Sequence, residues 1–170
     1  YLTEEYIDFT GDEEILQIET PYLQGPILEE GQDERYDKYL ESNIKENIYK
    51  HCIKAIEKSL NFGENGLPKI GSGDWNDGFS TVGNKGKGES VWLGFFMYTV
   101  LRDFIPICEK KGDLEKVEKY NRNYAKIKKG FKYKWMGWKM YKRAFMDNGD
   151  VLGSLQNEEL EHFLNRWPVE

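Results

Sequence analysis

Apolar residues recur at helical spacing in the stretch that follows Asn43. Asn43 and Glu46 match the capping-box pattern, in which two side chains satisfy backbone N–H groups at the start of a helix. The pattern therefore predicts an amphipathic helix that begins after Asn43 and ends near Leu60. Its apolar face would carry Ile44, Ile48, Cys52, Ala55 and Ile56.

Two further helices are predicted in the second half of the chain. Residues 91–108 are apolar almost all round, which is typical of a buried helix. Ser90 would cap this helix, and Pro106 and Gly112 would end it. Asp113 would cap the next helix. The apolar face of that helix would carry Leu114, Val117, Tyr120, Tyr124 and Ile127.

The remaining segments give shorter patterns. Residues 1–9 are typical of the end of a helix, and an aspartate can cap a second short helix over residues 12–18. Prolines and glycines across residues 21–31 predict a long loop. The aromatic stretch 135–148 fits a turn or a short hairpin, and residues 157–167 predict a final helix. The sum is an all-α chain whose long loops join successive helices.

Residues 62–88 form the least regular segment. They are rich in glycine, contain one proline and show no sustained hydrophobic period. Loops of this length in compact domains are usually functional or disordered. Apolar residues favour a structured loop over a disordered one. These residues are Leu67, Ile70, Trp75, Phe79 and Val82.

Charge is divided unevenly along the chain. The net charge of −6 combines −10 over residues 1–50 with +4 over the remainder. The lysines between Lys110 and Arg143 are interleaved with Glu115 and Glu118, so we interpret them as a solvated helix face and expect no nucleic-acid partner.

The cysteine and histidine content limits the classes of site. Cys52 and Cys108 lack CxxC spacing and fit a reducing compartment. Two histidines are too few for a histidine-rich metal centre, so we expect no metal site. We also expect no cofactor. No apolar run approaches the roughly 20 residues of a membrane span. We therefore expect a cytoplasmic protein with no membrane segment in this chain.

The sequence Gly73-Asp74-Trp75-Asn76-Asp77-Gly78 concentrates chemistry within the glycine-rich segment. Cleavage of a glycosidic bond needs a carboxylic acid that protonates the leaving oxygen. An aromatic face can stack on a sugar, amides can bind hydroxyls, and glycines let a ligand approach the backbone. The spacing does not fit a calcium, Walker or dinucleotide-binding loop. A structural turn, in which Asp and Asn satisfy their own backbone, stays open as the alternative.

Residues 67–78, 82–83 and 86–93 resemble the central signature of glycoside hydrolase family 94, a family of sugar phosphorylases. The resemblance extends over nearly the whole chain. It is closer to the phosphorylase-like domain of cyclic β-1,2-glucan synthases than to cellobiose phosphorylase. It implies a partial (α/α)6 barrel with a long glycine-rich active-site loop. Residues 1–170 would then be a fragment of the catalytic barrel, without the family's N-terminal β-sandwich and its phosphate-site segment.

The resemblance also implies an activity. Such an enzyme is an inverting glycosyltransferase that cleaves β-linked gluco-oligosaccharides with inorganic phosphate as co-substrate and releases a sugar 1-phosphate. Asp77 would be its general acid. The residues implied in substrate binding are Trp75, Asn76, Asp74, Lys87 and Glu89. For Lys87 and Glu89, a charged pair near a helix start is the alternative interpretation.

Some positions depart from the family pattern. Lys50 stands where an acidic residue is usual, Met136 stands where Trp-Asp-Gly is expected, and residues 159–162 replace an expected Cys and Asp. We therefore expect the isolated chain to be inactive or nearly so. The resemblance also implies that the intact enzyme forms a homodimer. A non-catalytic carbohydrate-binding or structural helical module is the alternative function.

Overall fold

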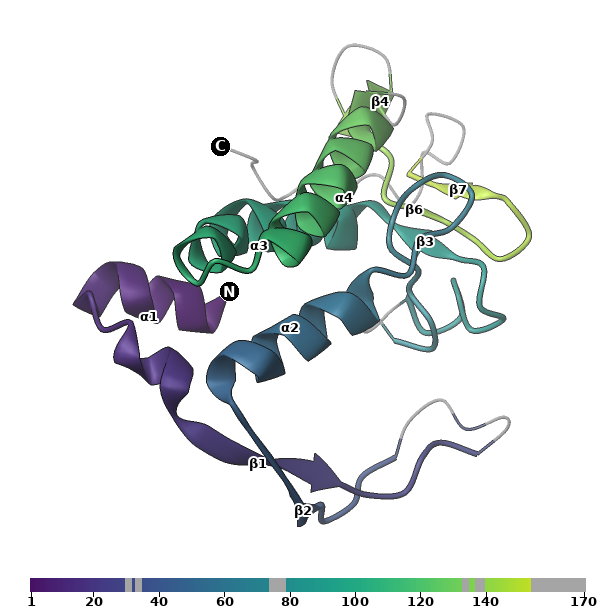
Figure 1. Ribbon diagram of the computed structural model, residues 1–170. Helices are drawn as coiled ribbons and strands as arrows, with labels where there is room; N and C mark the ends of the chain where they lie inside the picture. Colours follow the sequence, from purple (N-terminus) through teal and green to yellow (C-terminus); the bar gives the residue numbers. More distant parts are fainter. Residues whose placement is uncertain (30–31, 33–34, 74–78, 133–134, 137–139, 154–170) are drawn as a thin grey trace.

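Four α helices and several short strands make up the part of the chain that the computed structural model describes, residues 1–29, 32, 35–73, 79–132, 135–136 and 140–153 (Figure 1). The predicted helix over residues 157–167 lies outside these residues. In chain order the elements are α1 (Leu2–Thr10), the 3-10 helix η1 (Glu14–Gln17), β1 (Glu19–Gln24), β2 (Leu40–Asn47), α2 (Ile48–Ser59), β3 (Glu89–Ser90), α3 (Val91–Lys110), α4 (Leu114–Lys132), β4 (Trp135–Met136), β5 (Met140–Tyr141), β6 (Ala144–Phe145) and β7 (Val151–Leu152).

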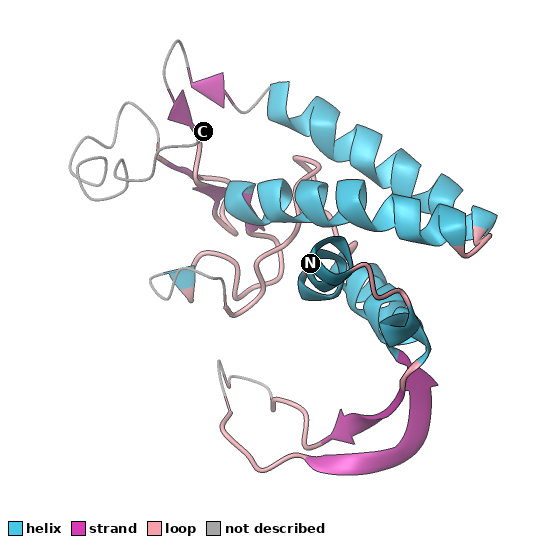
Figure 2. Ribbon diagram, turned by 90° about the vertical axis from the view of Figure 1, so that its left-hand side faces the viewer, coloured by secondary structure: helices cyan, strands magenta, loops and turns pink. Residues whose placement is uncertain are grey.

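The apolar core joins α1 and the three longer helices. α3 and α4 lie side by side, and α2 contributes Ile53 and Ile56 to the same core (Figures 1 and 2). Burial of these apolar side chains is the main favourable contribution to folding. The side chains with 0% or 1% exposure in this core are Leu101, Phe104, Cys108, Tyr120 and Ile127.

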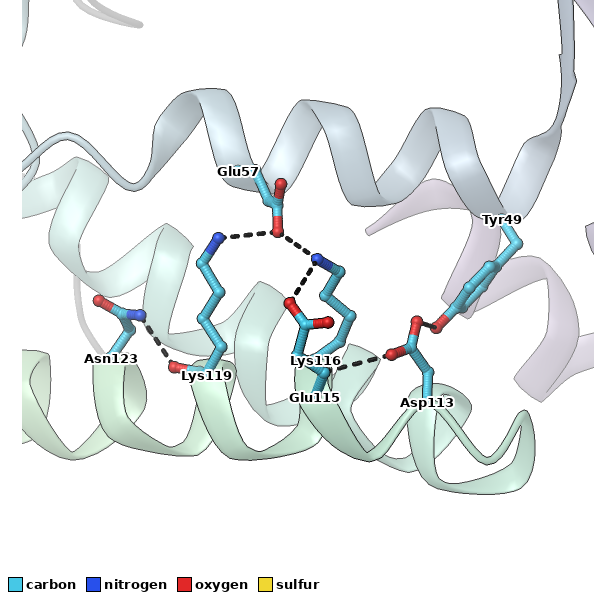
Figure 3. Close-up of polar contacts among 7 residues, drawn as sticks. All are labelled: Tyr49, Glu57, Asp113, Glu115, Lys116, Lys119 and Asn123. Atoms are coloured by element: carbon cyan, nitrogen blue, oxygen red, sulfur yellow. Dashed lines mark hydrogen bonds and ion pairs between the residues drawn. The ribbon is translucent and has the colours of Figure 1, made fainter.

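Polar contacts fix α2 against α4 at the edge of this core (Figure 3). The Glu57 carboxylate accepts from the amines of Lys116, at 2.9 Å, and Lys119, at 2.8 Å. The Tyr49 hydroxyl donates to Asp113 Oδ2 at 3.0 Å. Hydrogen bonds from Lys119 and, to a smaller extent, from Lys116 lower the pKa of Glu57. Exposed pairs of this kind contribute little individually, so they fix the register of the helices more than the stability.

The predicted caps of the two long helices are confirmed. Ser90 Oγ accepts from Leu93 N at 3.1 Å, and Asp113 Oδ1 accepts from Lys116 N at 3.3 Å. Gly112 has a φ of 70°, which suits the left-handed end of α3. Pro106 does not end α3, because the helix continues through it to Lys110.

Two predicted faces are wrong in part. α3 is buried along one side only, and Trp92 and Phe96 keep more than 40% of their surface exposed. Leu114 is 73% exposed at the first turn of α4, whereas the other four predicted residues of that face contact the core. Both errors arise because periodicity places residues on a helix without showing which neighbouring elements cover them.

The prediction of an all-α chain needs correction, because residues 19–47 contain an antiparallel hairpin. β1 pairs with β2 from Glu19 opposite Asn47 to Gln24 opposite Leu40. Asn43 therefore lies in β2, and the cap of α2 is Asn47, whose Oδ1 accepts from Lys50 N at 3.0 Å. Ile44 is 62% exposed on this strand instead of lying on a helix face. The loop predicted over residues 21–31 begins only after β1.

The second hydrophobic region surrounds a small sheet in the order β3-β6-β7. Glu89 pairs with Phe145 and Ser90 with Ala144, and β6 pairs in turn with β7. The aromatic stretch around residue 140 forms the predicted hairpin, β4 paired with β5. This sheet holds the end of the glycine-rich segment against the start of α3.

α3 is long and apolar enough to cross a membrane when judged by length and composition alone. The core helices of proteins without membrane spans pass the same test, and α3 packs against α4 and α2. The described helices are compatible with part of an (α/α)6 barrel, but they do not test whether the barrel forms, so it stays a prediction.

Candidate functional site

The predicted catalytic sequence lies outside the residues that the structure describes. This applies to Asp74, Trp75, Asn76 and Asp77. The structure does describe both flanks of this sequence, residues 61–73 and 79–90, together with the elements that hold them.

The preceding flank folds into a tight turn that returns to its own start. Gly63 N donates to Leu67 O and Lys69 N donates to Asn61 O, both at 2.9 Å. Leu67 at the end of the turn is fully buried beneath α3, where it meets Val91 and Phe145. The chain then reaches Gly71, whose φ of 70° suits a residue without a side chain.

Glu89 holds this turn from the interior. Its side chain is 2% exposed, and its carboxylate accepts three hydrogen bonds, from Asn65 N at 2.9 Å, from Asn65 Nδ2 at 3.0 Å and from Leu67 N at 2.9 Å. A Cβ at Gly63 would lie 2.3 Å from the Glu89 carboxyl carbon, so only glycine leaves room for this contact. The structure thus gives Glu89 a framework role. Its contact with substrate stays a prediction.

The following flank is a turn that wraps around the side chain of Asp147. Asp147 Oδ2 accepts from Lys85 N at 2.8 Å, and Oδ1 accepts from Lys87 N at 2.8 Å and from Gly88 N at 2.9 Å. Asp147 lies in the turn between β6 and β7, about sixty residues further along the chain. Sequence reasoning missed this residue. The only sequence signal is the polar turn Asp147-Asn148-Gly149-Asp150, which does not reveal a distant partner.

Lys87 lies on the solvent side of the same turn. Its side chain is exposed and lines a cavity of about 240 Å³ together with Thr81, Lys85, Met146, Asp147 and Asn148. Lys87 and Glu89 therefore face different surroundings, one in the open cavity and one in the interior. The prediction that Lys87 contacts substrate stays untested by this geometry.

The electrostatics of the framework follow from these contacts. Partial desolvation would raise the pKa of Asp147, but the backbone hydrogen bonds from Lys85, Lys87 and Gly88 outweigh it and lower the pKa. The side chain is therefore an anion at neutral pH. Among the described residues, no group of three or more His, Cys, Asp or Glu side chains could hold a metal ion.

The two described flanks lie on either side of a sequence that carries two carboxyl groups, an amide and an indole. Backbone hydrogen bonds join the two flanks directly, since Ile70 N donates to Gly88 O at 2.9 Å and Ser90 N donates to Pro68 O at 3.0 Å. These bonds bring the described flanks together on either side of the sequence from Gly73 to Gly78. Such an arrangement suits acid chemistry on a bound ligand, where geometry decides the rate.

Comparison with known proteins extends these observations. Residues 2–168 match the family model described as glycosyl hydrolase 94 superfamily, catalytic domain. The chain is similar to cyclic beta-(1,2)-glucan synthase NdvB of Rhizobium meliloti (strain 1021), with 37% identity over 155 residues, which is 91% of this chain and 6% of the relative.

Two phosphorylases of Paenibacillus borealis are also similar to this chain. The first is 3-O-beta-D-glucopyranosyl-beta-D-glucuronide phosphorylase, with 34% identity over 127 residues, 73% of this chain and 16% of the relative. The second is solabiose phosphorylase, with 28% identity over 168 residues, 96% of this chain and 20% of the relative. The chain thus spans a fifth or less of the length of these relatives. The match nevertheless covers nearly every residue of this chain, and the protein therefore belongs to the glycosyl hydrolase 94 family, within its catalytic domain.

Proposed function

We propose that this chain is part of an inverting glycoside phosphorylase that cleaves β-linked gluco-oligosaccharides with inorganic phosphate. The observation that carries the proposal is the family match across residues 2–168, which includes the sequence from Gly73 to Gly78. The anchored flanks around that sequence support the proposal, because acid catalysis depends on a carboxyl group held in one geometry.

The proposed reaction exchanges one bond for another. Asp77, protonated at the start, donates its proton to the glycosidic oxygen, and the bond between that oxygen and the anomeric carbon breaks. A phosphate oxygen attacks the opposite face of the same carbon, so the products are a sugar 1-phosphate of inverted configuration and a shortened sugar. Phosphate takes the place of the activated water, so a second catalytic carboxylate is not required.

The neighbouring residues would bind the sugar. Trp75 offers a flat apolar face on which a pyranose ring can stack. Asp74 and Asn76 offer acceptors and a donor for sugar hydroxyls. Lys87 would contribute from the turn that follows, because its exposed side chain lies on the solvent side of this flank.

The substrate to test first is a β-1,2-linked gluco-oligosaccharide, since the relative at 37% identity is named a cyclic beta-(1,2)-glucan synthase. Because the chain spans at most 20% of the three relatives described above, we further propose that turnover requires residues beyond these 170. The intact enzyme would work as a cytoplasmic homodimer with no cofactor other than phosphate as co-substrate.

The test is phosphorolysis by the longest gene product that contains these residues. Release of sugar 1-phosphate from β-linked gluco-oligosaccharides is measured with and without phosphate, for the wild type and for Asp77→Asn. Loss of the general acid should lower kcat by about 10²–10⁴-fold while sugar binding, measured by calorimetry, changes little. The exposed Asp8→Asn substitution serves as the control.

Two results would contradict the proposal. Turnover by Asp77→Asn at the wild-type rate would remove Asp77 from its role. Sugar binding by the wild type without any turnover would favour the alternative, a non-catalytic carbohydrate-binding module. If the 170-residue chain alone turned over substrate as fast as the longer product, the proposal that further residues are required would fail.

A further inference from the structure

We propose that Asp147 is a positioning residue for catalysis, because its carboxylate holds the turn that follows the catalytic sequence. The inference rests on the proposed function, since it assigns Asp147 a part in the same reaction. Asp147 lies in the turn between β6 and β7, outside the family signature of residues 67–78, 82–83 and 86–93.

The contact is a partly exposed carboxylate that accepts from backbone amides. Three N–H groups, those of Lys85, Lys87 and Gly88, donate to it over distances of 2.8 to 2.9 Å. Successive backbone N–H groups that converge in this way form an anion-binding concavity. Here the anion belongs to the protein itself. Hydrogen bonds to an ionised acceptor are roughly twice as strong as neutral ones, so this contact can set the shape of the turn.

Close backbone packing carries this shape to both flanks. A Cβ at Gly88 would lie 2.4 Å from Val82 O, and a Cβ at Gly83 would lie 3.2 Å from Gly71 O. The backbone therefore passes so close to Val82 and to the preceding flank that neither glycine leaves room for a side chain. Ile70 N donates to Gly88 O at 2.9 Å, so a movement of Gly88 also moves the chain at Ile70. Interiors packed this closely transmit displacements instead of absorbing them.

The main chain of Asp147 isolates the role of its side chain. Its backbone N–H donates to Val82 O at 2.9 Å, and every residue other than proline carries this donor. Asp147→Asn keeps the oxygen that accepts from Lys87 and Gly88, but presents an amide instead of an acceptor to Lys85 N. Asp147→Ala loses all three bonds. The two variants therefore form a graded pair.

Asp150 provides the matched control. It is exposed in the same turn, and its carboxylate accepts from Asn148 Nδ2 at 2.7 Å without touching the segment from Lys85 to Gly88. Asp150→Asn changes the local charge by the same amount as Asp147→Asn. A purely electrostatic or turn-stability effect would appear in both variants, whereas a positioning effect would appear at Asp147 alone.

The experiment has two independent readouts in the longest gene product that contains these residues. Amide hydrogen exchange, resolved by mass spectrometry over residues 82–88, reports the contact without any substrate. Steady-state phosphorolysis at a temperature well below unfolding reports its effect on catalysis. We expect Asp147→Ala to lose protection in this peptide and to lower kcat by about 100-fold with KM within about 3-fold. Asp147→Asn should fall between Ala and wild type, and Asp150→Asn should match wild type.

Other outcomes would overturn either the positioning role of Asp147 or the proposed function. If Asp147→Ala keeps wild-type kcat, or if Asp150→Asn loses as much activity, Asp147 is not a positioning residue. A rise in KM at unchanged kcat would indicate substrate binding and would also overturn the inference. If the wild type shows no phosphorolysis, the proposed function fails and the inference fails with it. In that case the exchange data would still report whether the carboxylate holds the turn.

Discussion

Glu89 offers the sharpest test of the framework, because its carboxylate is buried and fully engaged. The side chain is 2% exposed and binds one turn, at Asn65 and Leu67. Replacement by Gln preserves the shape but exchanges one acceptor oxygen for a donor. Whichever way the amide is oriented, at least one N–H of the turn then faces another N–H.

The cost can be worked from these contacts. A buried donor left without an acceptor costs about 1–3 kcal/mol, so Glu89→Gln should lower the free energy of unfolding by about 2 kcal/mol. For a cooperative unit of about 150–250 residues, 1 kcal/mol corresponds to roughly 2–4 °C in Tm, so the expected fall is about 4–8 °C. Glu89→Ala adds a void and removes every acceptor, and we expect about 4 kcal/mol.

Thermal unfolding followed by circular dichroism measures the effect. Glu64→Gln is the matched control, because Glu64 is exposed in the same turn, and a surface change there should stay within about 0.5 kcal/mol. If Glu89→Gln lowered Tm no more than Glu64→Gln does, the carboxylate would not hold the turn and the framework described above would be wrong.

Two further predictions concern other regions of the fold. Hydrogen bonds from Lys54 and, to a smaller extent, from Tyr22 lower the pKa of Glu46 from 4.5 to about 2. The contribution of this carboxylate to stability is therefore present above pH 4.5 and is lost as the pH falls towards 2. Denaturant unfolding at several pH values should show a smaller loss of stability over this range for Glu46→Gln than for the wild type, and an equal loss would contradict the assignment. The buried Tyr120 hydroxyl has no hydrogen-bond partner among the described residues, so Tyr120→Phe should leave stability unchanged or raise it by up to about 1 kcal/mol. Tyr49→Phe removes a hydroxyl that donates to the Asp113 carboxylate, so it should lower stability by about 1 kcal/mol. Chemical denaturation of both variants decides this, and a larger loss at Tyr120 would refute it.

Local signals predicted the helices well where caps and periodicity agreed. Ser90 and Asp113 cap α3 and α4 as expected, because a cap is a contact between residues three apart in the chain. The capping-box pattern at Asn43 predicted the wrong helix start because strand pairing, a contact between distant residues, overrode it. A capping-box pattern can occur inside a strand, and here pairing of β1 with β2 moved the helix start to Asn47.

The hairpin itself gave a weak local signal. Pro21 lies within β1, where proline usually indicates a loop, and the register of the pair shifts between Pro21 and Leu23. Tertiary contacts at the base of the hairpin stabilise it. The Tyr22 ring stacks on His51 of α2 at 3.8 Å between centroids, and His51 Nε2 lies 3.0 Å from Thr20 O. Such contacts between distant residues cannot be read from periodicity.

The sequence by itself determined the family and the candidate chemistry of this protein. The run from Gly73 to Gly78 and its surroundings are a contiguous signature, so no coordinates are needed to recognise it. Only the tertiary structure decided what holds the flanks of that signature. Glu89 reaches a turn some twenty residues earlier, and Asp147 reaches one some sixty residues earlier. The physical reason is that a carboxylate withdrawn from water, fully at Glu89 and partly at Asp147, needs donors. The fold, rather than the neighbouring sequence, determines which backbone N–H groups supply them.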